Sequence, residues 1–312
     1  MIITRYNSEQ HKEWNDFIMK SFNGSFLFNR KYMDYHKDRF EDHSIIIKDK
    51  DEWLSVFPGN VYENEWSSHS GLSYGGLVSG LLSQRKILNI LSEVILYLKK
   101  NGISKVKIKL IPDIYYRYNQ QAFTYALFKL GFNLIRRDAS STIFLDEQHK
   151  TYKGRISSIN RALREGIYVK ESNDYKSFIE LVNKNLREKY GIKAVHSDEE
   201  ISLLARELKE NIKLIIAKKN SEILAGGIVY IVGHVMHLQY FSTNYNKPNS
   251  GAGDLVIKHC LDLCKRMNLK IFDFGSSTEK NGLYLNEGLN KYKESFGAVT
   301  TILDHYEKQL DD

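Results

Sequence analysis

The amino-acid sequence predicts an α/β protein made of two domains of similar plan, each a mixed, mostly antiparallel sheet flanked by helices. The chain has 312 residues, which exceeds what one hydrophobic core usually supports. With 42% hydrophobic and 27% charged residues, its composition is that of an ordinary globular protein. Both halves also repeat one order of patterns: helices, alternating strands, a polar loop, a helix and a strand. We therefore expect one domain over residues 1–150 and a second over 151–312, joined by a helical segment.

The first half contains clear helix and strand patterns. Residues 83–102 space Ile, Leu and Val three and four apart and stop at Asn101-Gly102, which predicts an amphipathic helix. Residues 104–112 alternate polar and apolar side chains, which predicts a strand. On the same criteria we expect short helices in 8–40, a strand at 43–49, one or two strands in 51–69 broken at Pro58-Gly59, a glycine-rich loop at 70–80, a helix at 119–132 and a strand at 140–146.

The second half repeats this plan. Its apolar run at 224–241 contains His234, His237 and Gln239 and a Val-Gly break, so it predicts a hairpin of two strands and not a membrane span. The other expected elements are helices at 154–166, 174–191 and 197–211, a strand at 212–219, a loop at 244–253, a helix at 254–268 and a strand at 269–275.

Charge and cysteine content bound the kind of protein. A formal charge of +7 favours polyanionic partners such as phosphates, nucleotides, tRNA or acidic lipid, although the lysines are scattered and a merely basic surface is an equal alternative. Cys260 and Cys264 stand four apart in an apolar helix, which predicts buried thiols rather than a disulfide or a metal site. The N-terminus lacks a cationic stretch followed by an apolar one, so we expect a cytoplasmic protein without a signal peptide or bound metal.

The loop before the helix at 254–268 predicts an anion site. Backbone N–H groups at a helix N-terminus bind phosphate, and the sequence "NSGAGD" stands at this position. We expect Lys247, Ser250, Gly251 and Gly253 to hold the diphosphate of a cofactor there. Alternatively, the two glycines serve a tight turn and Asp254 caps the helix.

Alternation along the strand "VMHLQYF" predicts its two faces. His237, Gln239 and Phe241 would share one face, with Met236, Leu238 and Tyr240 on the other. Polar groups on an otherwise apolar strand need partners. The strand "KIFDFGSSTE" can supply them, since it presents Asp273, Gly275, Ser277 and Glu279.

Four stretches together resemble a known family: "SGLSYGGLVSG", "GRISSINRALREGIYV", "HLQYFSTN" and "FDFGSSTEKNGLYLNEGLNKYKESFG". In this order they are similar to tandem GNAT-type acyltransferases, in the branch of the Fem peptidoglycan-bridge aminoacyltransferases and acetyltransferase-like proteins of bacterial polysaccharide loci. The resemblance covers residues 1 to about 308. It implies two tandem GNAT-like domains, the first on the acceptor side and the second on the donor and catalytic side.

The resemblance also implies where the reaction occurs. In the GNAT fold two central strands splay apart and free main-chain groups for the acyl end of the donor; here these strands would be "VMHLQYF" and "LKIFDFG". The lysine of the family's terminal segment, near the donor, matches Lys293, preceded by Tyr292. One departure stands out: Pro248 occupies the position of the usual Arg or Gln of the diphosphate loop, which puts coenzyme A binding in question.

Acyl transfer to an amine needs a base, because the attacking amine must be neutral, and it needs donors for the oxyanion. Asp273, Glu279 and His237 are candidate bases, Tyr240 and Tyr284 candidate proton donors, and Lys293 a candidate for stabilising negative charge. Most of these residue types also serve ordinary packing or solvation. Candidate substrate contacts are Gln239, Tyr74, Gly75, Gly76, Tyr284, Asn286, Tyr292 and Arg161, the last on a helix with Arg155 and Arg164.

The sequence-based hypothesis is N-acylation, most simply acetylation from acetyl-CoA, of an amino group on a nucleotide- or lipid-linked sugar of surface polysaccharide. The acceptor is expected in a cleft between the domains. One alternative is an aminoacyl-tRNA-dependent transferase acting on a peptidoglycan precursor, which would need a continuous basic surface. Another is a non-catalytic module that recognises a glycan or partner. No DNA partner is expected.

Overall fold

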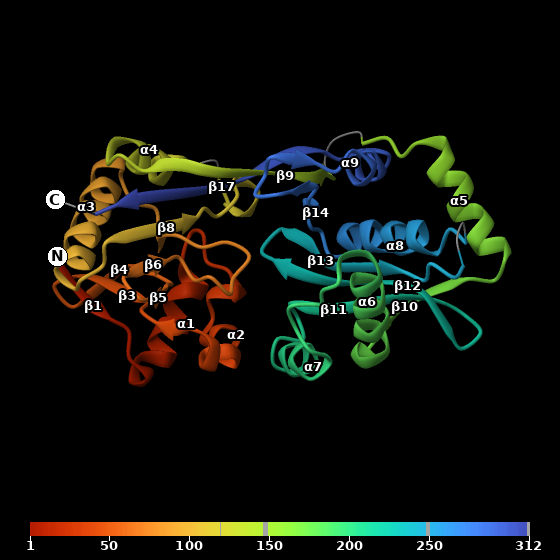
Figure 1. Ribbon diagram of the computed structural model, residues 1–312, viewed down its shortest axis with the longest axis horizontal. Coiled ribbons are helices and arrows are strands. Elements are labelled where there is room, and N and C mark those ends of the chain that lie inside the picture. Colours follow the sequence, from red (N-terminus) through yellow and green to blue (C-terminus); the bar gives the residue numbers. More distant parts are fainter. Residues whose placement is uncertain (119, 146–148, 248–249, 311–312) are drawn as a thin grey trace. The chain divides into compact units, whose positions relative to one another are not determined.

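The computed structural model describes residues 1–118, 120–145, 149–247 and 250–310 (Figure 1). The chain forms two compact units. The first contains Met1–Ala139, Thr278–Tyr284 and Ile302–Asp312, and the second contains Ser140–Ser277 and Leu285–Thr301. The units are therefore discontinuous, unlike the simple expected division at residue 150, because late segments of the chain pair with early ones.

The first unit has an α/β architecture. One sheet has the order β1-β3-β4-β7, and a second ladder joins β2, β5, β6, β8 and the C-terminal part of β17. Its strands are β1 (Ile2–Arg5), β2 (Glu41–Asp42), β3 (Ile45–Asp49), β4 (Glu52–Phe57), β5 (Asn60–Tyr62), β6 (Glu65–Ser67), β7 (Val78–Ser79) and β8 (Lys105–Lys109). Its helices are α1 (His11–Lys20), α2 (Arg30–Met33), α3 (Gln84–Lys100) and α4 (Ala122–Lys129), with 3-10 turns η1 (Ser8–Gln10), η2 (Phe26–Phe28), η3 (Asp34–Arg39) and η4 (Asp113–Tyr115).

Local sequence explains these elements. Ser83 caps α3 by accepting a hydrogen bond from the Lys86 N–H, and the apolar stripe of the helix is buried. Val106 and Ile108 of β8 face the same core, as the alternation predicts. Residues 51–69 form three strands instead of the one or two expected, because the short turns at Pro58-Gly59 and Glu63-Asn64 each separate a paired strand from the next.

The second unit carries a sheet of order β10-β11-β12-β13-β14-β9. Its strands are β9 (Asn133–Phe144), β10 (Tyr168–Ser172), β11 (Ile212–Lys219), β12 (Glu222–Val232), β13 (Val235–Thr243) and β14 (Ile271–Ser276). Its helices are α5 (Lys153–Arg164), α6 (Tyr175–Tyr190), α7 (Asp198–Glu207), α8 (Ala252–Arg266) and α9 (Glu287–Glu294). Short strands β15 (Thr278–Glu279) and β16 (Tyr284–Leu285) pair with each other, and β17 (Val299–Gln309) closes the described chain.

Two long strands belong to both units. The predicted strand at 140–146 is the end of β9, which begins at Asn133, and β17 was not expected from the sequence. The last residues of β17 pair antiparallel with β8, for example His305 with Lys109. This pairing explains why residues beyond 301 group with the first unit.

The predicted hairpin is confirmed as β12 and β13, but its faces differ from the expectation. Ile228 pairs with Tyr240 whereas Val229 pairs with Leu238, so Gln239 is an extra residue in a β-bulge. The bulge shifts the alternation by one. Phe241 consequently packs into the core with Leu238, and the expectation that it shares a face with His237 was wrong.

Each unit has its own core. In the first, α3 and α4 cover β3, β6 and β8; in the second, α8 packs on β11 to β14, with its two cysteines buried as free thiols. Burial raises the pKa of both thiols, to about 12 for Cys264.

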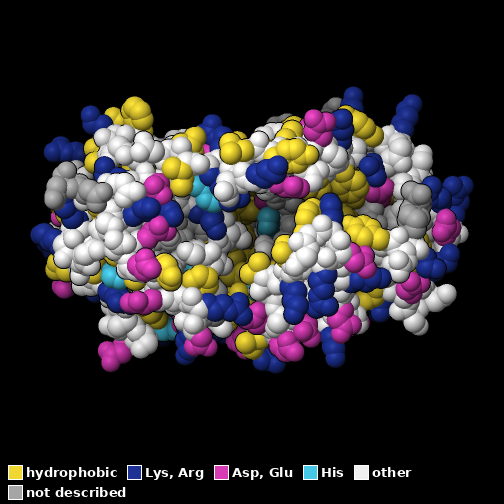
Figure 2. Space-filling view, viewed as in Figure 1, with side chains coloured by type: hydrophobic (Ala, Val, Ile, Leu, Met, Phe, Trp, Pro, Cys, Tyr) yellow, Lys and Arg dark blue, Asp and Glu magenta, His cyan; other side chains and the backbone are white. Residues whose placement is uncertain are grey.

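Over the face in Figure 2, basic and acidic side chains are interspersed. Within the described residues, no helix is both long and apolar enough to cross a bilayer.

Candidate active site

The central strands β13 and β14 separate after a short parallel contact. Their described register has three pairs, Val235 with Ile271, Met236 with Phe272 and His237 with Asp273. Beyond His237, β13 continues to Thr243 while β14 bends at Gly275, whose φ is +76°. The splay that the resemblance implied is therefore present, and it leaves one edge of β13 without a β14 partner beyond this register.

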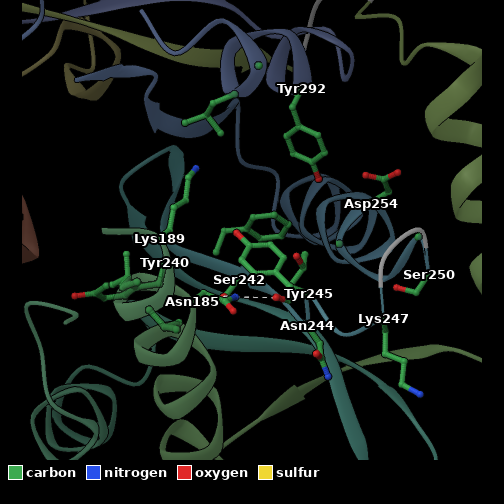
Figure 3. Close-up of a pocket in the computed structure, with 18 of the residues that line it drawn as sticks. Asn185, Lys189, Tyr240, Ser242, Asn244, Tyr245, Lys247, Ser250, Asp254 and Tyr292 are labelled. Carbon is green, nitrogen blue, oxygen red and sulfur yellow. Dashed lines mark hydrogen bonds between the residues drawn. The ribbon is translucent and has the colours of Figure 1, made fainter. Parts of the chain in front are cut away.

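A cavity of about 850 Å³ lies within the second unit next to this edge. Figure 3 shows side chains from α6, β13, the loop before α8, α8 itself and α9 around it. The cavity brings together many of the predicted site residues, namely Gln239, Tyr240, Lys247, Ser250, Gly251, Gly253, Arg161, Asn286 and Tyr292. Its volume falls in the range typical of small-molecule sites.

The N-terminus of α8 borders the cavity, and close packing explains its glycines. A Cβ atom at Gly251, whose φ is +73°, would lie 2.4 Å from the carbonyl oxygen of Ser158. A Cβ at Gly253 would lie 2.8 Å from the Thr243 side chain and 3.1 Å from Phe241. The glycines thus let α8 approach α5 and β13. The alternative that Asp254 caps the helix is wrong, because Gly251 is the N-cap residue and Asp254 lies in the first turn, where it accepts from Arg155. Pro248 lies outside the described residues.

One wall of the cavity is a buried polar cluster. The Arg155 guanidinium donates to both oxygens of Asp254 at 3.2 Å and stacks over the Tyr292 ring at 4.5 Å. Burial, with a further contribution from the Asp254 carboxylate, raises the Tyr292 pKa well above its ordinary value. Arg155 is therefore used to neutralise Asp254. Arg161 lines the cavity, whereas Arg164 lines a separate shallow groove on α5.

The opposite wall contains residues that the sequence analysis missed. Asn185 of α6 is buried and donates to the Ser242 hydroxyl at 2.6 Å and the Thr243 carbonyl at 2.8 Å (Figure 3). Lys189, one turn further along α6, also lines the cavity. A signal was present, because Asn185 follows Phe178 and Val182 on the apolar face of α6, where a polar side chain needs a partner.

The bulge places two predicted residues at the cavity. Tyr240 lies 2.7 Å from His196 Nδ1, and burial raises its pKa, so the phenol is protonated at neutral pH. The Gln239 Oε1 atom is buried and has no hydrogen-bond partner among the described residues. A buried acceptor of this kind is costly unless a ligand or water donates to it.

A second cluster of predicted residues surrounds Gly275. The His237 Nδ1 atom lies 2.8 Å from Asp273 Oδ2, while Asp273 Oδ1 accepts from the Ser140 hydroxyl and the Gly275 N–H, each at 2.9 Å. Asp273 is 4% exposed. These contacts hold Asp273 in place, so that it favours the tautomer in which His237 carries its proton on Nδ1 and exposes Nε2 as an acceptor.

Lys293 completes this cluster. Its ammonium donates to the carbonyls of Gly275 at 2.8 Å and Ser276 at 2.7 Å. Burial lowers its pKa to about 8, against a smaller opposing effect of Asp273. Lys293 therefore fixes the bend that ends β14. It directly follows Tyr292, which lines the cavity.

The remaining predicted residues lie elsewhere in the fold. Glu279 and Tyr284 belong to the β15–β16 pair of the first unit. Tyr74 is 4% exposed, stacks near Tyr115 and shares a hydrogen bond with Ser25, so the structure gives it a packing role in the first unit. Gly75 contacts the Ser68 backbone closely, and Gly76 has a φ of +130°. No group of His, Cys, Asp and Glu among the described residues could hold a metal ion.

Comparisons with known proteins agree with this geometry. Residues 150–294 match a family model described as an acetyltransferase (GNAT) domain. No curated protein sequence was significantly similar. The structure is similar to that of FemX (TM-score 0.71, 13% identity, 99% of this chain and 97% of the other covered).

Two further solved structures share the whole fold. L-PGS from Bacillus licheniformis has a TM-score of 0.61 at 12% identity, with 100% of this chain and 95% of the other covered. A tandem GNAT protein from the clavulanic acid biosynthesis pathway has a TM-score of 0.57 at 8% identity, with 100% and 99% covered. The chain therefore has a tandem, Fem-related GNAT-like fold, its residues 150–294 form a GNAT acetyltransferase domain, and the protein is an acyltransferase.

Proposed function

We propose that the protein is an N-acyltransferase that moves an acyl group, most simply acetyl, from acyl-CoA to an amino group of a nucleotide- or lipid-linked sugar for cell-surface polysaccharide. The observation that carries the proposal is the His237–Asp273 pair at the end of the β13–β14 contact, 2.8 Å apart. A histidine oriented by a buried carboxylate, next to splayed strands of a GNAT domain, suits proton removal from an ammonium group.

The proposed reaction consists of proton removal from the acceptor, attack on the thioester and release of the thiol. His237 Nε2 takes a proton from the acceptor ammonium, and the free amine attacks the thioester carbonyl. The oxyanion accepts hydrogen bonds from main-chain N–H groups on the free edge of β13. As the new C–N bond forms, the C–S bond breaks, and the thiolate takes a proton, for which the Tyr240 phenol is the proposed source. The nitrogen then loses its second proton, which restores the Tyr240 phenol through water, and His237 releases the first proton to solvent. Asp273 orients His237 and does not itself exchange the proton.

The cavity in the second unit would hold the donor. Arg161, Lys189 and Lys247 supply positive charge for phosphate groups, and Ser250 lies at the α8 N-terminus. Gln239 Oε1 lacks a partner and can accept from an amide N–H of the pantetheine arm. These features support acyl-CoA as the donor.

Aminoacyl-tRNA is a second candidate donor, favoured by one specific feature. Asp254 places a buried carboxylate in the first turn of α8, where a bound diphosphate would otherwise gain most from the helix N-terminus. Arg155 offsets this charge. A tRNA partner also requires a continuous basic surface, and on the face in Figure 2 the basic side chains are mixed with acidic ones.

Ligand-dependent stability tests the donor first. The melting temperature is measured with millimolar acetyl-CoA, with CoA, and with bulk tRNA at two salt concentrations. A ligand at about 100 times its Kd stabilises the folded state by about 2.7 kcal/mol, which is readily visible. A shift with acetyl-CoA and CoA supports the proposal, whereas a salt-sensitive shift with tRNA alone would replace the donor.

Transfer is then measured as free CoA thiol released with a panel of nucleoside-diphosphate amino sugars. Lys293→Met should lower turnover by removing the support of the Gly275 bend, and Lys291→Met, an exposed neighbour on α9, is the matched control. Binding of no donor, together with no turnover, would favour a non-catalytic module. Turnover that survives both His237→Asn and Lys293→Met would instead overturn the roles assigned to these two residues.

A further inference from the structure

The first unit contains a separate polar cavity that the proposed transfer does not use. It has a volume of about 320 Å³ and is lined by β6, β8, β9, β17 and the segment after β6. The side chains that define it are Ser68, His69, Lys107, Lys109, Arg136 and His305. All belong to the first unit, so the cavity is complete within it.

Lys109 is the key side chain. Its ammonium donates to the Leu72 carbonyl at 2.6 Å, and no carboxylate of the described residues lies within ion-pair distance of it. Burial, with a smaller contribution from the nearby Arg136 and against the effect of Asp138, lowers its pKa to about 8. A largely buried cation without an acidic partner is costly to the fold. Such a group is therefore expected to serve an anionic ligand.

The other two cations of the cavity are paired with carboxylates. Lys107 pairs with Glu65 at 2.8 Å and Arg136 with Asp138 at 2.7 Å. Lys107 also lies 3.9 Å from Glu307, so carboxylates offset both of these cations, and Lys109 is the cation of the cavity that has none within ion-pair distance among the described residues. The pKa of His305 is affected by the same cations. Burial, together with Arg136 and Lys109, lowers this pKa to about 4 despite Asp138.

His69 provides an independent sign of a built site. It is 3% exposed and has a φ of 58°, a left-handed conformation that is uncommon for a residue other than glycine. Strained backbone of this kind persists where the surroundings impose it and concentrates at binding sites. The turn that carries His69 also places the Ser68 hydroxyl beside β8. This hydroxyl accepts a hydrogen bond from the main-chain N–H of Lys109 at 2.9 Å.

We infer that this cavity binds a phosphate or diphosphate group, held by Lys109 with Lys107 and Arg136 at its rim. The group could be carried by a nucleotide, by a polyprenyl lipid, or as free pyrophosphate, and the shared chemistry is the phosphoryl anion. The first two carriers are also those of the proposed acceptor, so in that form the inference rests on the proposed function. Its test remains separate, because binding is measured without any acyl donor.

Calorimetric titration of the full chain with pyrophosphate, a nucleoside diphosphate and a short prenyl diphosphate tests the inference. Lys109→Met should weaken binding about tenfold or more, the usual effect of losing a charge-assisted hydrogen bond. Lys105→Met is the matched control, because Lys105 lies on the same strand but does not line the cavity. Lys247→Ala identifies separately any binding of the same anions in the cavity of the second unit, which Lys247 lines.

Comparison of the three ligands also identifies which molecule carries the phosphoryl group. If one organic diphosphate binds more tightly than pyrophosphate, its organic part is recognised as well. If all three bind equally, the phosphoryl groups alone are recognised. Lys107→Met gives a second variant, on a more exposed lysine, if Lys109→Met does not fold. Absence of binding for all three ligands, or binding that Lys109→Met weakens no more than Lys105→Met does, would overturn the inference.

The pH dependence gives a further readout. Binding should weaken between pH 7 and pH 9, because Lys109 loses its proton near pH 8. His305, with a pKa of about 4, stays neutral over this range. Equal affinity at both pH values would contradict the role of Lys109.

Discussion

His237 Nδ1 and Asp273 Oδ2 lie 2.8 Å apart at the last residue pair that β13 and β14 share. Because Asp273 is also held by Ser140 and the Gly275 N–H, it can orient the imidazole without a change in its own position. The pair is thus placed by the same strand geometry that opens the edge of β13.

Removing the proposed base should strongly reduce turnover. His237→Asn deletes the proton acceptor, and loss of a general base typically costs about 10²- to 10⁴-fold in rate. Asp273→Asn should give a smaller loss, because the base remains but is poorly oriented. Release of CoA thiol at saturating donor measures both, with His259→Asn on α8 as the control. Near-normal turnover of His237→Asn would exclude it as the base.

Lys109 should make stability depend on pH. Its folded pKa of about 8 lies below the ordinary value of 10.5, so between these values the unfolded chain binds the proton that the folded chain has lost. The free energy of unfolding therefore gains a contribution that rises with pH over this window. Urea unfolding of the wild type and Lys109→Met at pH 7 to 10 measures it, and the difference between them should grow with pH. Parallel curves, as expected for Lys105→Met, would contradict the assignment.

Asn185→Ala should destabilise the second unit. The substitution removes both hydrogen bonds from α6 to β13 and leaves the Ser242 hydroxyl and Thr243 carbonyl without this donor. A cost of about 1–3 kcal/mol is expected for each buried group left unsatisfied. Chemical denaturation should show this loss, while Asn290→Ala on the exposed side of α9 should change stability by less than about 0.5 kcal/mol.

Gly251→Ala should be destabilising by more than about 2 kcal/mol, because a left-handed φ and a carbonyl oxygen both oppose the new methyl group. Gly154→Ala is the contrasting variant: its Cβ meets nothing within 4 Å, so helix propensity should make it neutral or stabilising. Thermal denaturation compares the two. Equal melting temperatures would show that α8 can move away from α5.

Much of the fold could be predicted, since periodicity located α3, α6, α8 and the β12–β13 hairpin. The bulge at Gln239 could not, because alternation is read by counting residues and an inserted residue leaves no mark in composition. The central part of β9 was missed for another reason. Its Arg136 and Asp138 form an ion pair in which Asp138 is 1% exposed, so a buried position looked polar.

The candidate site, too, could be predicted only in part from the sequence. His237 and Asp273 were found because each is a polar residue at a core position of neighbouring strands. Lys189 was missed because nothing in the sequence of α6 distinguishes its lysines from one another. The packing of Tyr74 against Tyr115, and of Gly75 against Ser68, could not be predicted, because contacts between distant segments of the chain leave no mark in the local sequence.

The pairing of β17 with β8 has a consequence for synthesis of the chain. The ribosome delivers residues 1 to 139 first, but a strand of that unit's sheet emerges only after residue 301. Residues 140 to 277, which form most of the second unit, become available earlier. The N-terminal part of the protein must therefore wait, with β8 unpaired on one side, until nearly the whole polypeptide has been translated, and this interval is when chaperones would have most to protect.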